Sequence, residues 1–185
     1  INWTSGSVGS GGPNQDVTFG NGKYVLSGWT TTYSTDDFTS WTSNGGFCSY
    51  GITYGNNLFI SVGNQHCNVN KSDNGSSWTQ TYDISGGATL EGITYGNNIF
   101  VGVGYTSSYK TWILISSDGS NWASSVSGEY SGNLQDVTYG NNLFITVGSS
   151  GTILTSPDGT SWTSRTSGTT ANLRGINFGN STFVA

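Results

Sequence analysis

The chain of 185 residues has no methionine, two prolines, two cysteines, one histidine and five lysines and arginines together. Its formal net charge is −5. Five scattered cations cannot line a groove for a phosphate backbone, which argues against nucleic acid as a partner. No zinc-ligand spacing and no phosphate-binding loop occurs, so we expect neither a metal nor a cofactor. No apolar run approaches the ~20 residues of a membrane-spanning helix, so we expect no membrane span.

Glycine and aromatic residues are what the chain has in quantity. It contains 29 glycines, and 14% of its residues are aromatic while 8% are charged. Disordered chains are highly charged and poor in aromatics, so we expect residues 1–185 to form a single folded domain. Abundant Ser, Thr, Asn and Gly with little Lys and Glu is typical of secreted or cell-surface repeat proteins, and we therefore expect an extracellular or surface location.

Two short motifs repeat along the whole chain. The segment Tyr-Gly-Asn-Asn-Leu/Ile-Phe stands at residues 54–59, 95–100 and 139–144, with weaker copies at 19–24 and 178–183. Between these copies, a Ser-x-Asp-Gly-x-x-Trp segment stands at 116–122 and 156–162, with diverged copies at 35–41 and 72–78. The repeated tryptophans are 38, 37, 44 and 40 residues apart: Trp3, Trp41, Trp78, Trp122 and Trp162.

Each period contains four short segments that we interpret as β-strands, and the first of them alternates polar and apolar residues. In the fourth copy they are strand a (residues 136–139), strand b (143–147), strand c (152–155) and strand d, which begins at Trp162. A period near 40 with four strands and no helical pattern predicts an all-β fold, a β-propeller of four-stranded blades. We place the blades at about 16–44, 50–82, 91–127 and 135–167. A partial blade of residues 174–185 with 1–6 would close a five-bladed ring, and a truncated larger propeller is the alternative.

The repeated hairpins at 116–122 and 156–162 resemble the Asp-box (BNR) motif of sialidase-type and photosystem II assembly factor-type propellers. The whole repeat is similar to bacterial surface repeat proteins of the BNR-like or WD40/YVTN-like kind. The usual Asp box has one more residue between Asp and Trp than these copies have. Because Asp side chains cap their own turns, we expect structural roles at the repeated position: Asp37, Asn74, Asp118 and Asp158.

Binding is expected on the face that carries the variable loops, because variable loops on a rigid scaffold are where binding residues concentrate. The loops that enter strand a and those between strands b and c vary in length from repeat to repeat, whereas the turns on the other face are nearly constant. The candidate ligand-binding residues on the variable face are mostly aromatic: Trp29, Tyr50, His66, Tyr105, Tyr109, Trp112 and Tyr130.

Enzyme activity is not expected. The resemblance to sialidases would imply three arginines around a carboxylate, a Tyr nucleophile with a Glu partner, and an acidic Asp. The chain has only two arginines, Arg165 and Arg174, so that activity cannot be carried over. A two-carboxylate glycosidase needs a neighbouring pair of acids, and nothing in the sequence pairs those outside the repeated turns: Asp16, Asp83, Glu91, Glu129 and Asp136.

The two cysteines lie on variable-face connections of one blade. Cys48 stands just before a strand a, and Cys67 stands where the next strand c is due. We predict a Cys48–Cys67 disulfide, which fits an oxidising compartment. The function we expect is a non-enzymatic extracellular binding or adhesion module that recognises a glycan or a surface protein. The alternative is a structural subunit of a filament or ring, assembled as a homo-oligomer by strand exchange at the incomplete fifth blade.

Overall fold

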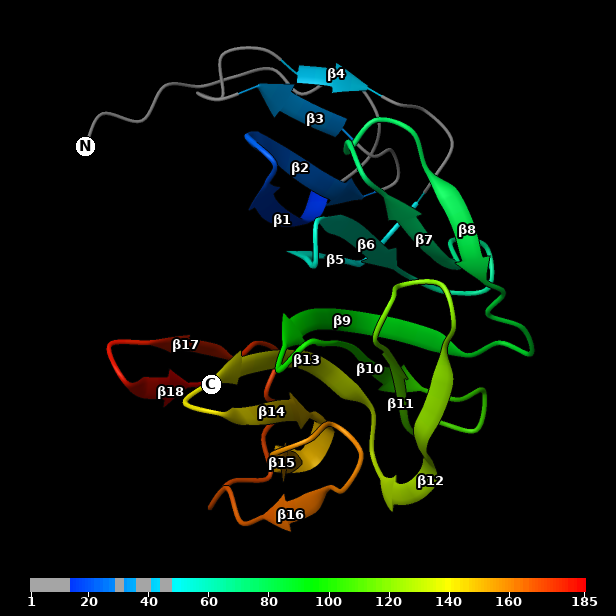
Figure 1. Cartoon of the computed structure of the whole chain (residues 1–185). Coiled ribbons are helices and arrows are strands. Elements are labelled where there is room, and N and C mark those ends of the chain that lie inside the picture. Colours follow the sequence, from blue (N-terminus) through cyan, green and yellow to red (C-terminus); the bar gives the residue numbers. More distant parts are fainter. Residues whose placement is uncertain (1–13, 29–31, 36–40, 44–47) are drawn as a thin grey trace.

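The computed structural model describes residues 14–28, 32–35, 41–43 and 48–185, which form antiparallel sheets along the chain (Figure 1). The first sheet consists of β1 (Asn14–Gly20), β2 (Lys23–Gly28), β3 (Thr32–Thr35) and β4 (Trp41–Ser43). The second consists of β5 (Gly51–Gly55), β6 (Leu58–Val62), β7 (Val69–Ser72) and β8 (Thr79–Tyr82). The third consists of β9 (Thr89–Gly96), β10 (Ile99–Tyr105), β11 (Lys110–Ser116) and β12 (Ala123–Ser131).

The fourth sheet consists of β13 (Leu134–Gly140), β14 (Leu143–Gly148), β15 (Ile153–Ser156) and β16 (Thr163–Arg165). A two-stranded sheet of β17 (Asn177–Gly179) and β18 (Thr182–Val184) follows, and a single 3₁₀ turn, η1 (Ser149–Gly151), is the helical segment assigned in the described residues. None of these segments is a helix long and apolar enough to span a membrane. Strand order equals chain order in every sheet, so each sheet is a simple meander.

Tight asparagine turns join the first two strands of each sheet. In the second sheet Gly55 pairs with Leu58, and Asn56 and Asn57 between them have φ angles of 48° and 60°. Asn tolerates this left-handed conformation better than most residues, which suits it to the two-residue hairpin. The repeated Asn-Asn pairs therefore set the register between the first two strands.

The sheets are arranged around a common axis. The first strands of successive sheets contact one another in the order β1, β5, β9, β13 and β17, and the later strands of each sheet lie progressively farther out (Figure 1). This arrangement is a β-propeller, as the sequence predicted. The five-bladed ring stays a prediction, because Figure 1 shows the β17–β18 hairpin apart from β1.

The hydrophobic core lies in layers between neighbouring sheets. Val25 of the first sheet packs with Ile52 and Phe59 of the second. A larger layer joins the second and third sheets, and another joins the third and fourth. Each layer contains a fully buried Phe from the second strand of a sheet: Phe59, Phe100 and Phe144. The aromatic part of the repeated motif is therefore the packing between blades.

A glycine at the end of each first strand makes room for an aromatic ring of the next blade. A Cβ atom at Gly55 would overlap the ring of Tyr95, and one at Gly96 would overlap the ring of Tyr139. The same ring-on-glycine contact is made by Tyr54 on Gly20 and by Phe178 on Gly140. We call this contact the ring–glycine lock, and it accounts for the aromatic-Gly pair in the repeated motif.

The polar turns of the opposite face cap themselves as predicted for Asp in turns. The carboxylate of Asp118 accepts hydrogen bonds from the backbone N–H groups of Ser120 and Asn121, both at 2.8 Å. Asp158 and Asn74 accept equivalent bonds in their own turns. These backbone N–H donors hold the pKa of Asp118 and of Asp158 well below the usual range. Asp37 lies outside the described residues.

Two of the repeated tryptophans, Trp122 and Trp162, close their own turns. Trp162 Nε1 donates to the carbonyl of Gly159 at 3.0 Å, and Trp122 Nε1 donates to Gly119. Because the indole folds back onto its own turn, the last strand of the fourth sheet begins at Thr163 rather than at Trp162 as the sequence predicted. The turn glycines also touch the preceding blade, and a Cβ at Gly119 would lie 2.7 Å from Ile60 Cδ1.

Candidate functional site

A polar pocket of about 390 Å³ lies at the axis, on the face that carries the variable loops. It is lined from successive blades by residues that stand at or next to one repeat position: Gln15, Asp16, Tyr50, Glu91, Gly92, Gln135, Asp136 and Arg174. One repeat position near the start of the first strand is always Asp or Gly: Asp16, Gly51, Gly92, Asp136 and Gly175. Because the first strand of every sheet starts at this end of the axis, the residue directly before this position points toward the centre. We call this hollow the axial pocket.

The residues of the axial pocket that stand at this shared position are chemically diverse. They offer two amides from Gln15 and Gln135, a phenol from Tyr50, a carboxyl from Glu91 and a guanidinium from Arg174. The amides both donate and accept directional hydrogen bonds, the ionised carboxylate accepts them and the guanidinium donates them. The pocket can therefore satisfy a ligand that has several hydroxyl or amide groups.

Two aspartates that also line the axial pocket tie neighbouring blades together. Asp16 accepts hydrogen bonds from the N–H groups of Val17 at 2.8 Å and Ile52 at 3.0 Å. Asp136 accepts from Val137 and from Ile176, both at 2.8 Å. Burial raises the pKa of both carboxyls, and the nearby Asp16 charge raises the pKa of Asp136 further. We call this pair the axial aspartates.

Nothing in the sequence pairs the acids outside the repeated turns, and the structure corrects this point. Asp16, Glu91 and Asp136 line one pocket although 120 residues separate the first from the last. Both oxygens of each axial aspartate are nevertheless engaged by backbone N–H groups of the strands. No group of three or more His, Cys, Asp and Glu residues suited to a metal ion occurs in the described part of the chain.

Aromatic residues flank the axial pocket on one side. The Tyr105 hydroxyl interacts with the Glu91 carboxylate, and burial raises the pKa of both groups. Tyr109 stacks on Tyr105 with ring centroids 5.7 Å apart and an interplanar angle of 15°. Tyr109 is 68% exposed and has a φ angle of 56°, so the loop presents its ring to solvent. The two tyrosines form a ledge beside Glu91.

A second, less polar pocket of about 290 Å³ adjoins the axial pocket and shares Tyr50 with it. Its lining includes Asn64, His66 and the two cysteines. The Tyr50 hydroxyl accepts a hydrogen bond from Asn64 Nδ2 at 2.9 Å, and Asn64 Oδ1 accepts one from the His66 N–H. Tyr50 is thus held in place as the wall between the two pockets.

The predicted disulfide is present and forms part of this side pocket. Cys48 and Cys67 are bonded, with their Cα atoms 4.9 Å apart. The loop between the second and third strands turns back on itself, where the Cys67 N–H donates to the Asn64 carbonyl at 2.9 Å. A Cβ atom at Gly63 would overlap Cys67, so the missing side chain there lets the cysteine approach. The two variable-face loops are therefore linked directly beside Tyr50.

The structure brings three of the predicted ligand-binding residues to these two pockets or their rim, namely Tyr50, His66 and Tyr105, with Tyr109 stacked beside them. Trp112 is 8% exposed and packs in the core, with its ring centroid 6.4 Å from that of Tyr82, so it lies away from them. Its edge lines a separate pocket between the second and third sheets.

Tyr130 also lies elsewhere, because its hydroxyl donates to the Trp162 carbonyl at 2.8 Å. Trp29 lies outside the described residues. Sequence reasoning missed Gln15, Gln135 and Arg174 as site residues. The signal was available in the repeat alignment, since these residues stand directly before Asp16, Asp136 and Gly175, which occupy one repeat position.

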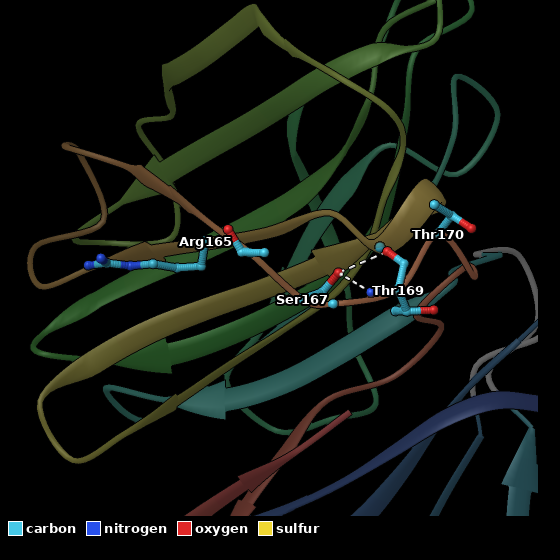
Figure 2. Close-up of a pocket in the computed structure, with 7 residues that line it drawn as sticks. Arg165, Ser167, Thr169 and Thr170 are labelled. Carbon is cyan, nitrogen blue, oxygen red and sulfur yellow. Dashed lines mark hydrogen bonds between the residues drawn. The ribbon is translucent and has the colours of Figure 1, made fainter.

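A larger hollow of about 610 Å³ lies beside the last strand of the fourth sheet (Figure 2). Its side chains are mostly exposed, and its polar groups bond to one another, with Ser167 Oγ donating to the Thr169 carbonyl at 3.0 Å. Figure 2 shows Arg165 extending away from Ser167 and Thr169. This hollow gathers no residues from different blades, so we take the axial pocket as the candidate site.

Comparison with protein families and with curated proteins finds no match. Solved structures that are similar in fold include the following three. YCF48 bound to a D1 peptide is 19% identical with a TM-score of 0.59, and the match covers 82% of this chain and 54% of that one. The GH74 enzyme of Niastella koreensis is 23% identical with a TM-score of 0.55, covering 81% and 24%.

The computationally designed Ika8 protein is 12% identical with a TM-score of 0.65, covering 90% of this chain and 53% of that one. The chain thus spans about half the length of the YCF48 and Ika8 chains. At these identities the likeness establishes the propeller fold alone.

Proposed function

We propose that this propeller is a non-enzymatic recognition module whose axial pocket binds a glycan. One observation supports this most strongly. Each successive sheet, or the loop that leads into it, contributes a side chain to a single polar pocket. Sugars are bound by planar polar side chains that accept and donate hydrogen bonds, together with an aromatic face. Gln15, Glu91 and Gln135 supply the first, and the Tyr105–Tyr109 ledge supplies the second.

The engagement of the axial aspartates supports binding rather than hydrolysis. A two-carboxylate hydrolase needs one acid free to protonate the leaving group and another free to attack or to activate water. Asp16 and Asp136 instead accept backbone hydrogen bonds on both of their oxygens. Their role in this proposal is to fix the blades around the pocket. An extracellular or surface location, supported by the Cys48–Cys67 disulfide, belongs to the same proposal.

A glycan array tests this proposal. We expect the labelled protein to bind a subset of glycans, and Gln135→Ala to weaken the best interaction about tenfold, which is the loss of roughly 1.4 kcal/mol of hydrogen bonding. Thr169→Ala, in the hollow of Figure 2, is the matched control and should bind like the wild type. Array binding that Gln135→Ala leaves unchanged, or no binding to any glycan, would refute the proposal.

A basic peptide segment of a surface protein is the second candidate ligand. The axial pocket holds the carboxyl groups of Asp16, Glu91 and Asp136 and a single guanidinium, that of Arg174. Ionised carboxylates would attract a Lys or Arg side chain, and one structural neighbour, YCF48, is bound to a peptide. Salt separates the two candidates, because binding of a basic peptide weakens as screening increases whereas binding of a neutral glycan does not.

The structural alternative, a subunit that accepts a strand from a neighbour, concerns the β17–β18 hairpin. Its outer strand, β18, has three residues, and Thr182 and Val184 in it are exposed. An edge so short offers few backbone groups for strand addition. Assembly of the purified chain into oligomers larger than a dimer would favour this alternative over a monomeric binding module.

A further inference from the structure

We propose that the pocket between the second and third sheets is a second binding site, which takes one neutral sugar residue. We call it the inter-blade pocket. One wall follows the end of β8 and carries Tyr82, Asp83 and Ser85, and the other carries Thr106, Ser107 and Trp112. These residues are different from those of the axial pocket, so the inference goes beyond the proposed function and does not depend on it.

Both walls of the inter-blade pocket are held in place by hydrogen bonds. In the first wall, the Ile84 N–H donates to Asn68 Oδ1 at 2.9 Å, and the Gly87 N–H donates to Gln65 Oε1 at 3.1 Å. In the second wall, backbone hydrogen bonds close the loop at residues 106–110 on itself. The pocket is therefore formed before a ligand arrives, as ligand pockets usually are.

The indole of Trp112 brings an unpaired donor to this pocket. Trp112 is 8% exposed, and its Nε1–H donates to no described residue, whereas those of Trp122 and Trp162 donate within their own turns. Among the described residues, Trp78 Nε1 is a fully buried atom without a partner, and Trp112 Nε1 is not fully buried in this way. Its N–H therefore reaches solvent, and the inter-blade pocket is the hollow that Trp112 lines. A donor on so deeply buried a ring is suited to an acceptor atom of a ligand.

The other polar side chains of the pocket are also available to a ligand. Within the part of the chain that the structure describes, no hydrogen bond engages the Asp83 carboxylate or the hydroxyl groups of Ser85, Thr106 and Ser107. The axial aspartates and the hollow of Figure 2 differ in this respect, because their polar groups bond within the protein. A carboxylate accepts, an indole N–H donates and hydroxyl groups do both. The hydroxyl groups of a sugar match this set.

Two aromatic rings supply the apolar part of the site. The ring centroids of Tyr82 and Trp112 lie 6.4 Å apart, with an interplanar angle of 48°. Aromatic side chains combine an apolar body with a polar tip, which suits a ligand with an apolar C–H face and polar edges. The pocket volume of about 290 Å³ lies at the lower limit of the ~300–1,000 Å³ of ligand pockets, so a single sugar residue fits better than a longer chain.

The charge of the inter-blade pocket favours a neutral sugar. Its described lining has one carboxyl group, that of Asp83, and no cationic side chain, so the carboxylate of an acidic sugar would be repelled. Aromatic rings beside a carboxylate can also bind a quaternary ammonium ion, which is the competing class of ligand. The Trp112 N–H favours the sugar, because a quaternary ammonium ion has no acceptor atom to offer it.

Nuclear magnetic resonance of ¹⁵N-labelled protein tests the inference, because each tryptophan indole N–H gives its own signal. Trp112→Phe identifies the signal of Trp112. The wild type is titrated in turn with glucose, galactose, mannose and N-acetylglucosamine, each to about 0.1 M. We expect at least one of these sugars to shift the Trp112 indole signal along a saturation curve. The signals of Trp122 and Trp162 are internal controls and should stay in place, because their N–H groups are already bonded.

Three exposed or pocket-lining positions give the matched variants. Asp83→Ala should weaken the sugar binding about tenfold, because it removes a charged hydrogen-bond acceptor. Asp73→Ala is the control, since Asp73 is also exposed and carries the same charge, but lies in the turn that follows β7 and should not affect binding. Gln135→Ala, in the axial pocket, should leave the Trp112 shift unchanged, which separates this site from the proposed function.

Three outcomes would overturn the inference. The first is a Trp112 signal that none of the four sugars shifts. The second is an equal effect of Asp83→Ala and Asp73→Ala on the binding. The third is a shift of the Trp112 signal with choline and with none of the sugars, which would assign the inter-blade pocket to an organic cation.

Discussion

The ring–glycine lock makes Gly96→Ala the most informative single substitution. Gly96 ends β9, and its Cβ would overlap the Tyr139 ring and lie 2.7 Å from the Tyr139 Cβ. A ring cannot swing away from a contact at its own root, so either the ring or the two blades must move. The backbone of Gly96 has no left-handed φ angle, so the effect measures packing between blades and not backbone strain.

We expect Gly96→Ala to lower the free energy of unfolding by about 3 kcal/mol, at the upper end of the usual cost of overpacking. For a chain of this size that corresponds to a fall in Tm of about 6–12 °C. Gly102→Ala is the control in the same sheet, because its Cβ would lie 3.5 Å from Leu90 Cδ1, an ordinary contact. It should be neutral or stabilise by up to about 0.5 kcal/mol, since Ala loses less backbone entropy than Gly.

Urea denaturation followed by tryptophan fluorescence and circular dichroism measures both variants. A double-mutant cycle with Tyr139→Ala isolates the contact. With the ring removed, Gly96→Ala should cost less than about 1 kcal/mol, because the added methyl group enters the space that the ring vacated. Additive effects of the two substitutions, or equal effects of Gly96→Ala and Gly102→Ala, would refute the lock as the contact that joins the blades.

Three further predictions concern the turns, the disulfide and the axial aspartates. Asp118→Ala should destabilise the protein at pH 7 more than Asp118→Asn, because Asn74 makes the same turn in its own repeat. The difference in stability between the wild type and Asp118→Asn should shrink below about pH 4, because the carboxylate that the folded state favours is progressively protonated there. Reducing the Cys48–Cys67 bond should lower the free energy of unfolding by about 3 kcal/mol in chemical denaturation. The urea midpoint of the wild type should fall as the pH rises above about 4, because the raised pKa of the axial aspartates means that the folded state resists their ionisation. Replacing both axial aspartates by Asn should make this fall smaller.

The propeller fold could be predicted because its information is local and repeated. Five imperfect copies of the aromatic-Gly pair and its Asn turn reinforce one another, and four copies of the Ser-x-Asp-Gly turn, two of them diverged, stand between them. The disulfide was also predictable, because repeat alignment places Cys48 and Cys67 at the ends of strands that flank a common neighbour. Because strands that are neighbours in the chain also pair in the sheet, the strand order within each sheet followed from the order of the segments in the sequence.

The candidate site was harder to predict because its residues are far apart in the sequence and differ in type. Gln15, Glu91 and Arg174 share a repeat position and not a chemical class, so motif searches that look for like residues do not find them. Trp112 was a candidate ligand-binding residue because it stands beside a variable loop. Its ring instead packs in the core between two blades. Burial between sheets depends on neighbouring blades, which one repeat does not encode.

Nuclear magnetic resonance with ¹⁵N-labelled protein tests the central proposal, that the axial pocket binds a glycan. The protein is titrated with the tightest glycan found on the array. The side-chain amides of Gln15 and Gln135 and the backbone amides of Glu91 and Arg174 should shift together along one saturation curve, because these groups line a single pocket. Shifts confined to the turns around Asp118 and Asp158, or to residues 166–170, would contradict the proposal.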